Sequence, residues 1–172
     1  MRAVCLYLHI HQPIRYREYS IFDVGNDSNY FYDNYNGRQS NERIFKKVAA
    51  KSYYPMLNLL LENMKKYPGF KISFSITGTW IEQAEKWEPK LLDIIREMVK
   101  REQVEIVGET YYHSLAYFYN IDEFNDQVRM HAPIVICFQD ESSAANVVQS
   151  LLAGRKKRKK GHSCAVGAVV PP

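Results

Sequence analysis

Two histidines, His9 and His11, stand one residue apart at the end of an apolar run that covers residues 3–10. Because side chains alternate along a strand, both imidazoles would lie on one face. Imidazoles in that arrangement bind a divalent metal ion or hydrogen-bond a substrate. The alternative is a buried, hydrogen-bonded His9, with only His11 reaching solvent. No third and fourth metal ligands stand out, so we expect no metal and no other cofactor.

Two carboxylates, Glu105 and Glu109, stand four residues apart in the segment 103–109. On one strand they would be about 13 Å apart, at about 3.3 Å per residue. A retaining glycosidase holds its two carboxyl groups about 5–5.5 Å apart and an inverting one about 6.5–9.5 Å. These two residues are therefore not expected to be the two catalytic groups of one reaction. Glu105 has apolar neighbours, so it must be paired, hydrogen-bonded or protonated, either in a site or in a structural ion pair.

Aromatic side chains offer surfaces that suit the apolar faces of sugar rings. The long segment 14–45 is rich in tyrosine and asparagine, and Trp80 and Trp87 follow later in the chain. Stacking on a sugar is one interpretation. Packing against neighbouring side chains is the other, and we expect it for Trp87 in particular.

The pattern of apolar residues predicts alternating strands and helices, which is typical of a parallel sheet with helices outside it. The expected strands are 3–10, 71–77 and 103–108, and the expected helices are 42–47, 55–67, 88–101 and 121–131. The first strand has no polar alternation, so we expect it to be buried on both faces.

Chemistry in such sheets lies at the carboxyl ends of the strands. Three segments fall there, namely 9–11, 77–80 and 105–113. Gly78 to Trp80 are expected to form a turn, and Asp122 to cap the helix that follows the third strand.

Beyond His131 the pattern changes. Pro133 is expected to end the helix, 134–138 to form a fourth strand and 144–154 a short helix. We divide the chain into 1–131 and a divergent segment 132–172, which is typical of a disordered or frameshifted sequence.

The composition of the 172 residues suits one domain with a packed core. The net charge of +4 comes from the six basic residues 155–160, without which 17 basic and 19 acidic side chains remain. No aromatic residue is interleaved with this run, so we expect no nucleic-acid partner. Three scattered cysteines form neither a disulfide framework nor a zinc site, and no apolar run is long enough to cross a membrane. We expect a cytoplasmic protein.

Four segments of the sequence resemble the N-terminal part of glycoside hydrolase family 57, and most closely its α-amylase-like members. They are LYLHIHQP at 6–13, NERIFKKVAAKSYYPMLNLLLE at 41–62, FSITGTWIEQAE at 74–85 and QVEIVGETYYHSL at 103–115. The resemblance covers about residues 1–131, and its first and last segments contain motifs that resemble the first two of the family's five signature regions.

The resemblance implies a (β/α)7 barrel and a retaining hydrolase or glucanotransferase that acts on α-glucans without a metal. It implies that His11 lies in the donor sugar subsite and that Glu105 supports the site by hydrogen bonding. Together with the strand-end argument, it gives the expected substrate-binding residues as His9, His11, Trp80, Glu105, Glu109 and His113.

The sequence departs from the family where the catalytic carboxylates are expected. The family's nucleophile, a glutamate, lies on the next strand, and its acid, an aspartate, on a later one. Glu141 is the one residue that could stand in for the nucleophile, and none remains for the acid. We therefore predict an incomplete barrel of three to four βα units, without turnover, whose open sheet edge could favour self-association.

Two alternatives to this glycosidase interpretation stay open. One is a metal-dependent barrel hydrolase or deacetylase that uses His9 and His11. The other is a non-catalytic protein that binds carbohydrate or nucleic acid.

Overall fold

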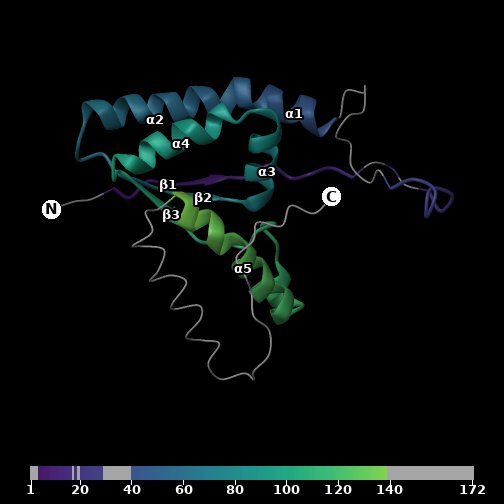
Figure 1. The fold of residues 1–172 in the computed structure, drawn as a ribbon. Coiled ribbons are helices and arrows are strands. Elements are labelled where there is room, and N and C mark those ends of the chain that lie inside the picture. Colours follow the sequence, from purple (N-terminus) through teal and green to yellow (C-terminus); the bar gives the residue numbers. More distant parts are fainter. Residues whose placement is uncertain (1–3, 17, 19, 29–39, 139–172) are drawn as a thin grey trace.

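The structure is a computed structural model, which describes residues 4–16, 18, 20–28 and 40–138. Strands and helices alternate in it, as the sequence predicts (Figure 1). In chain order they are β1 (Tyr7–Ile10), α1 (Asn41–Val48), the π-helical turn η1 (Ala49–Tyr53), α2 (Tyr54–Lys66), β2 (Ile72–Ile76), α3 (Gly78–Trp87), α4 (Lys90–Lys100), β3 (Val104–Val107), the 3₁₀ turn η2 (Ala116–Phe118) and α5 (Ile121–Phe138).

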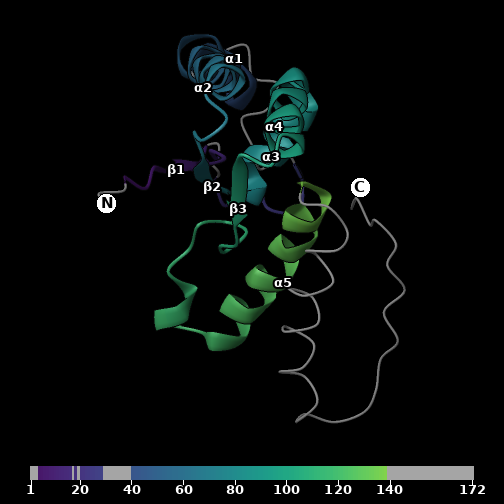
Figure 2. The ribbon, with the colours of Figure 1, turned by 90° about the vertical axis from the view of Figure 1, so that its left-hand side faces the viewer.

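The three strands form one parallel sheet in the order β1-β2-β3. Leu8, Phe74 and Ile106 are register partners, and their face of the sheet is apolar. His9 and Ser75 are register partners on the opposite face, which is polar. In Figures 1 and 2, α2 and α4 lie on one side of the sheet and α5 on the other, beside β3.

The core lies between the apolar face of the sheet and helices α1 to α4, and the end of α5 adds Val135 to it. Phe45, Phe74, Trp80 and Met98 are among its fully buried side chains. The rings of Phe45 and Trp80 lie 6.0 Å apart between centroids, which suits tilted aromatic packing. No helix in the described part of the chain combines the length and the apolar character that a membrane crossing needs.

The expectation that the first strand is buried on both faces is wrong. Tyr7 on β1 is 54% exposed, and Leu8 is only partly buried. Strands of a parallel sheet are buried on both faces only where helices cover both, and the helices of the core cover one face of β1 here.

Residues 78–80 form the start of helix α3 rather than a turn. Thr77 has the extended backbone of an N-cap, and its side-chain oxygen accepts a hydrogen bond from the Trp80 backbone N–H at 3.3 Å. A threonine at that position is a recognisable start signal for a helix.

Two expectations about the last helix are also wrong. Asn120, not Asp122, caps α5, because its side-chain oxygen accepts from the backbone N–H groups of Asp122 and Glu123 at 3.0 and 3.2 Å. The helix also continues through Pro133 to Phe138, so 134–138 is not a strand. Val135 lies beyond Pro133 and is buried in the core. Its burial offsets the cost of a proline inside a helix, which would usually break the helix there.

The predicted helix 144–154, the basic run 155–160 and Glu141 lie outside the described residues.

Two leucines of α2 provide a test of the core. Leu57 is 2% exposed and Leu59 is 54% exposed. Leu57→Ala should lower the free energy of unfolding by about 2–5 kcal/mol, because it leaves a cavity in a packed interior. Leu59→Ala, the matched control, should change it by less than about 0.5 kcal/mol. Urea unfolding of the two variants measures both, and equal effects would contradict this assignment of the core.

Candidate functional site

A cluster of polar side chains lies at the carboxyl ends of the three strands, on the polar face of the sheet. His9 is on β1, and His11 follows two residues later. Ser75 is on β2, and Glu109 lies two residues beyond the end of β3. The parallel register brings these residues together, because His9 pairs with Ser75 and Ser75 with Val107. The structure therefore confirms that the ends of the strands converge.

Glu109 lies at the centre of this cluster, with its side chain only 12% exposed. The hydroxyl of Ser75 donates a short hydrogen bond to its Oε1. Nδ1 of His9 lies 3.3 Å from the same hydroxyl oxygen and 3.7 Å from Oε1. Because a carboxylate only accepts, the serine proton points to Glu109, and His9 donates its Nδ1–H to the serine oxygen. The lone pair of His9 Nε2 is then available to a ligand.

His113 completes the cluster from the loop after β3. Its Nδ1 lies 3.3 Å from Oε2 of Glu109, and its ring centroid lies 4.3 Å from that of His9 and 4.9 Å from that of His11. The backbone of His113 has φ of +54°, a left-handed conformation that is uncommon for residues other than glycine. Such conformations cluster at functional sites, where neighbouring structure holds them.

The surroundings of two of these imidazoles favour the neutral form of the ring. Partial burial lowers the pKa of His9 and of His11, since a charged ring loses hydration there. The neighbouring His113 lowers both further, while the negative charge of Glu109 acts in the opposite direction. Neutral imidazoles carry one lone pair and one N–H each, so they can both accept and donate hydrogen bonds.

Side chains from η1 and α3 hold the backbone at His11 and Gln12. The hydroxyl of Tyr53 donates to the His11 carbonyl at 3.3 Å, and Nε2 of Gln83 donates to the Gln12 carbonyl at 2.7 Å. Nδ1 of His11 lies 3.0 Å from Oγ1 of Thr77, the residue that caps α3. The backbone at His11 is therefore held by η1 and α3, and its ring by the residue at the end of β2.

His131 of α5 supports the cluster from the interior. It is 1% exposed, and its Nε2 lies 2.7 Å from the carbonyl oxygen of Ile76. A carbonyl only accepts, so Nε2 carries the proton and Nδ1 accepts from the backbone N–H of Glu109 at 3.5 Å. One buried imidazole thus joins the ends of β2 and β3.

Residues 5–142 match the family model of glycosyl hydrolase family 57. The chain belongs to glycosyl hydrolase family 57. The predicted resemblance and the mixed α/β fold with a parallel sheet are both confirmed.

Proteins similar to this chain are named alpha-amylase or 4-alpha-glucanotransferase. A putative alpha-amylase from Methanocaldococcus jannaschii is 37% identical over 123 residues, which cover 71% of this chain and 25% of that protein. An alpha-amylase from Pyrococcus furiosus is 30% identical over 87 residues, which cover 51% of this chain and 13% of that protein. The chain therefore matches a quarter or less of these relatives.

A solved structure shares the fold. The crystal structure of 4-alpha-glucanotransferase from Thermococcus litoralis superposes with a TM-score of 0.54 at 21% identity, and the match covers 78% of this chain and 17% of that one.

The cluster contains four of the six residues that the sequence predicts for a family 57 substrate site, namely His9, His11, Glu109 and His113. Trp80 does not belong to it. Its side chain is fully buried beside Phe45 and Tyr53, so its ring offers no face to a sugar.

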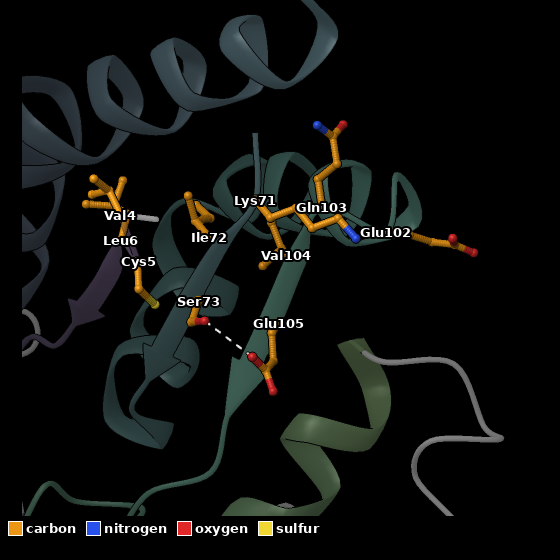
Figure 3. Close-up of a pocket in the computed structure, with 10 residues that line it drawn as sticks. All are labelled: Val4, Cys5, Leu6, Lys71, Ile72, Ser73, Glu102, Gln103, Val104 and Glu105. Atoms are coloured by element: carbon orange, nitrogen blue, oxygen red, sulfur yellow. Dashed lines mark hydrogen bonds between the residues drawn. The ribbon is translucent and has the colours of Figure 1, made fainter. Parts of the chain in front are cut away.

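Glu105 lies on the same polar face but one step closer to the amino ends of the strands. It is exposed at the edge of the described sheet, where it accepts a hydrogen bond from Ser73 at 3.3 Å. Its apolar neighbours in the sequence, Val104 and Ile106, therefore do not bury its carboxylate. Figure 3 shows Glu105 and Ser73 facing each other in a hollow at the amino ends of β2 and β3, where Lys71 and Gln103 also lie. Active sites of parallel α/β sheets lie at the other end.

Three residues of the site are not among those that the sequence predicts individually, although one of them, Thr77, begins the expected strand-end segment 77–80. Ser75 and Thr77 could have been found, because they alternate with Phe74 and Ile76 and so share a face with the strand-end histidines. His131 gave no signal, since its role depends on how α5 packs.

Gly78 allows the loop that carries Glu109 and His113 to approach α3. Its backbone N–H donates to the Tyr111 carbonyl at 2.9 Å, and a Cβ at this position would overlap the Tyr111 ring. Gly78→Ala should therefore lower the free energy of unfolding by about 1–3 kcal/mol through overpacking. It should also shift the imidazole NMR signals of His113.

Gly69 provides the matched control, because a Cβ there meets nothing within 4 Å. Gly69→Ala should leave stability unchanged or raise it by up to about 1 kcal/mol. In a double-mutant cycle, Tyr111→Ala should remove most of the cost of Gly78→Ala. A Gly78→Ala variant as stable as Gly69→Ala would contradict the close approach.

Proposed function

We propose that this chain provides the sugar-binding part of a family 57 site that acts on α-glucans. The observation that supports the proposal is the convergence of three imidazoles and Glu109 at the carboxyl ends of the parallel strands. The imidazole rings and the carboxylate offer hydrogen-bond donors and acceptors, which sugar hydroxyls can use. The names of the relatives add the substrate class, which we extend to this chain by inference.

His11 is the residue that we place against the sugar. Thr77 holds its Nδ1, so its Nε2 is free to bond a hydroxyl of a bound ring. We place His11 in the donor sugar subsite because the family resemblance implies that position. Glu109 would accept a further hydroxyl bond through an oxygen that Ser75 has already oriented.

We also propose that the 172-residue chain by itself does not turn over glucans. A retaining reaction needs two carboxyl groups about 5–5.5 Å apart. In the described part of the chain, the cluster contains one carboxylate, Glu109. Glu141, which lies outside the described residues, is the candidate for the missing nucleophile. The same proposal includes an incomplete barrel, a division of the chain at residue 131 and a cytoplasmic location.

Titration with maltoheptaose, followed by imidazole NMR signals, tests the binding. We expect the α-glucan to shift the signals of His11 and His113, and cellohexaose, its β-linked counterpart, to leave them unchanged. His11→Asn should weaken maltoheptaose binding about tenfold, because the loss of one hydrogen bond of about 1.4 kcal/mol has that effect.

Glu102→Gln serves as the control, since Glu102 lines the hollow at the opposite end of the sheet. It should bind maltoheptaose as the unaltered chain does. Glu105→Gln should weaken binding if Glu105 supports the site as the resemblance implies. Equal binding by His11→Asn and the unaltered chain would contradict the sugar site. Release of reducing ends from maltoheptaose would contradict the proposed lack of turnover.

A further inference from the structure

Glu82, an exposed residue of α3, bonds to the loop that carries Glu109 and His113. Its Oε1 accepts a hydrogen bond from the hydroxyl of Tyr111 at 2.5 Å. We propose that Glu82 is a positioning residue of the sugar site, which holds the loop after β3 in place through Tyr111. The inference rests on the proposed function, because the site that it concerns is the sugar-binding cluster.

Tyr111 lies midway between the two site residues of this loop. Glu109 stands two residues before it and His113 two residues after it. The backbone N–H of His113 donates to the Thr110 carbonyl at 3.1 Å, which closes a turn with Tyr111 at its first corner. The backbone N–H of Ser114 donates to the hydroxyl oxygen of Thr110 at 3.0 Å and so tightens the same turn. A displacement of Tyr111 would therefore move His113 with it.

Helix α3 holds Tyr111 at two points. The backbone N–H of Gly78 donates to the Tyr111 carbonyl at 2.9 Å, and Glu82 accepts from the Tyr111 hydroxyl. Gly78 and Glu82 are four residues apart, so they lie on the same face of the helix. The backbone bond sets the distance between the loop and α3, but one bond alone allows the loop to rotate about it. The bond at the far end of the Tyr111 ring prevents that rotation.

The hydroxyl of Tyr111 is a dependable donor. Burial of the ring and the bonded carboxylate of Glu82 raise the pKa of Tyr111 above its usual value, so the hydroxyl keeps its proton at neutral pH. Burial and the same carboxylate also raise the pKa of the neighbouring Tyr112. Glu82 thus acts on two consecutive residues that directly precede His113.

A second tyrosine–glutamate bond, at the other end of α3, provides a matched control. The hydroxyl of Tyr54, on α2, donates to Oε2 of Glu88 at 2.8 Å. Burial and this bond raise the pKa of Tyr54 to about 12. Glu88 lies about 15 Å along the helix from Gly78, at about 1.5 Å per residue. The two bonds therefore have the same chemistry, but only that of Tyr111 holds the loop of the site.

Calorimetric titration of the full chain with maltoheptaose tests the positioning role. Tyr111→Phe and Glu82→Ala each remove the bond, and each should weaken binding about three- to tenfold, the usual effect of one hydrogen bond on an equilibrium. The double variant should bind no more weakly than either single variant, because both changes remove the same bond. Glu82→Gln should bind within about twofold of the unaltered chain, since its amide oxygen still accepts from Tyr111.

Two control variants separate the bond from general effects. Tyr54→Phe removes the matched hydroxyl and should bind maltoheptaose as the unaltered chain does. Glu85→Ala removes another negative charge of α3 that raises the pKa of Tyr111, and it should also leave binding unchanged. Equal weakening by Tyr54→Phe and Tyr111→Phe would overturn the proposal. Unchanged binding by both Tyr111→Phe and Glu82→Ala would overturn it as well.

The imidazole NMR signals of His113 in the sugar-free chain distinguish a failure of this inference from a failure of the proposed function. Tyr111→Phe and Glu82→Ala should shift these signals, whereas Tyr54→Phe should leave them in place. If the unaltered chain binds no maltoheptaose, the proposed function fails, and the His113 signals then decide whether the bond holds the loop. Signals that neither Tyr111→Phe nor Glu82→Ala shifts would overturn the inference.

Discussion

The parallel register of β1, β2 and β3 is the constraint on which the site depends. It aligns Leu8 with Phe74 on the apolar face, and the same alignment sets His9 beside Ser75 on the polar face. A shift by one residue would turn every side chain of a strand to the opposite face. The burial of Phe74 therefore fixes the position of His9, since exposing that ring to water would cost about 2 kcal/mol or more. The same strand register therefore forms the core on one face of the sheet and the site on the other.

Thr77 links this alignment to the helices. It is fully buried, accepts from the Trp80 backbone N–H as the cap of α3, and lies 3.0 Å from the ring of His11. The next residue, Gly78, leaves room for Tyr111 and so for the loop that carries Glu109 and His113. One β-strand end thus determines the start of a helix, the orientation of one imidazole and the approach of the loop with two more site residues.

The sequence could predict the strands and the place of the site, because both follow local signals. Apolar alternation marks β2, and the carboxyl ends of parallel strands must meet, so the convergence of His9 and Glu109 was predictable. Trp80 could not be assigned, since an indole packs as well in a core as on a sugar. That α5 continues through Pro133 could not be predicted either. Burial of Val135 against distant residues offsets the tendency of proline to break a helix. What the sequence left open depends on contacts between residues that are far apart in the chain.

The charge of the cluster limits what it can bind. His9 and His11 lie close to each other and to His113, and burial with mutual repulsion disfavours charge on both rings. Glu109 then contributes a negative charge in a partly buried position, where Coulomb interactions are stronger than in bulk water. An anionic ligand would meet repulsion from that carboxylate without an opposing cation on His9 or His11. A neutral sugar can use the lone pairs and N–H groups of the same rings. The electrostatics of the site thus favour a neutral ligand over an anionic one.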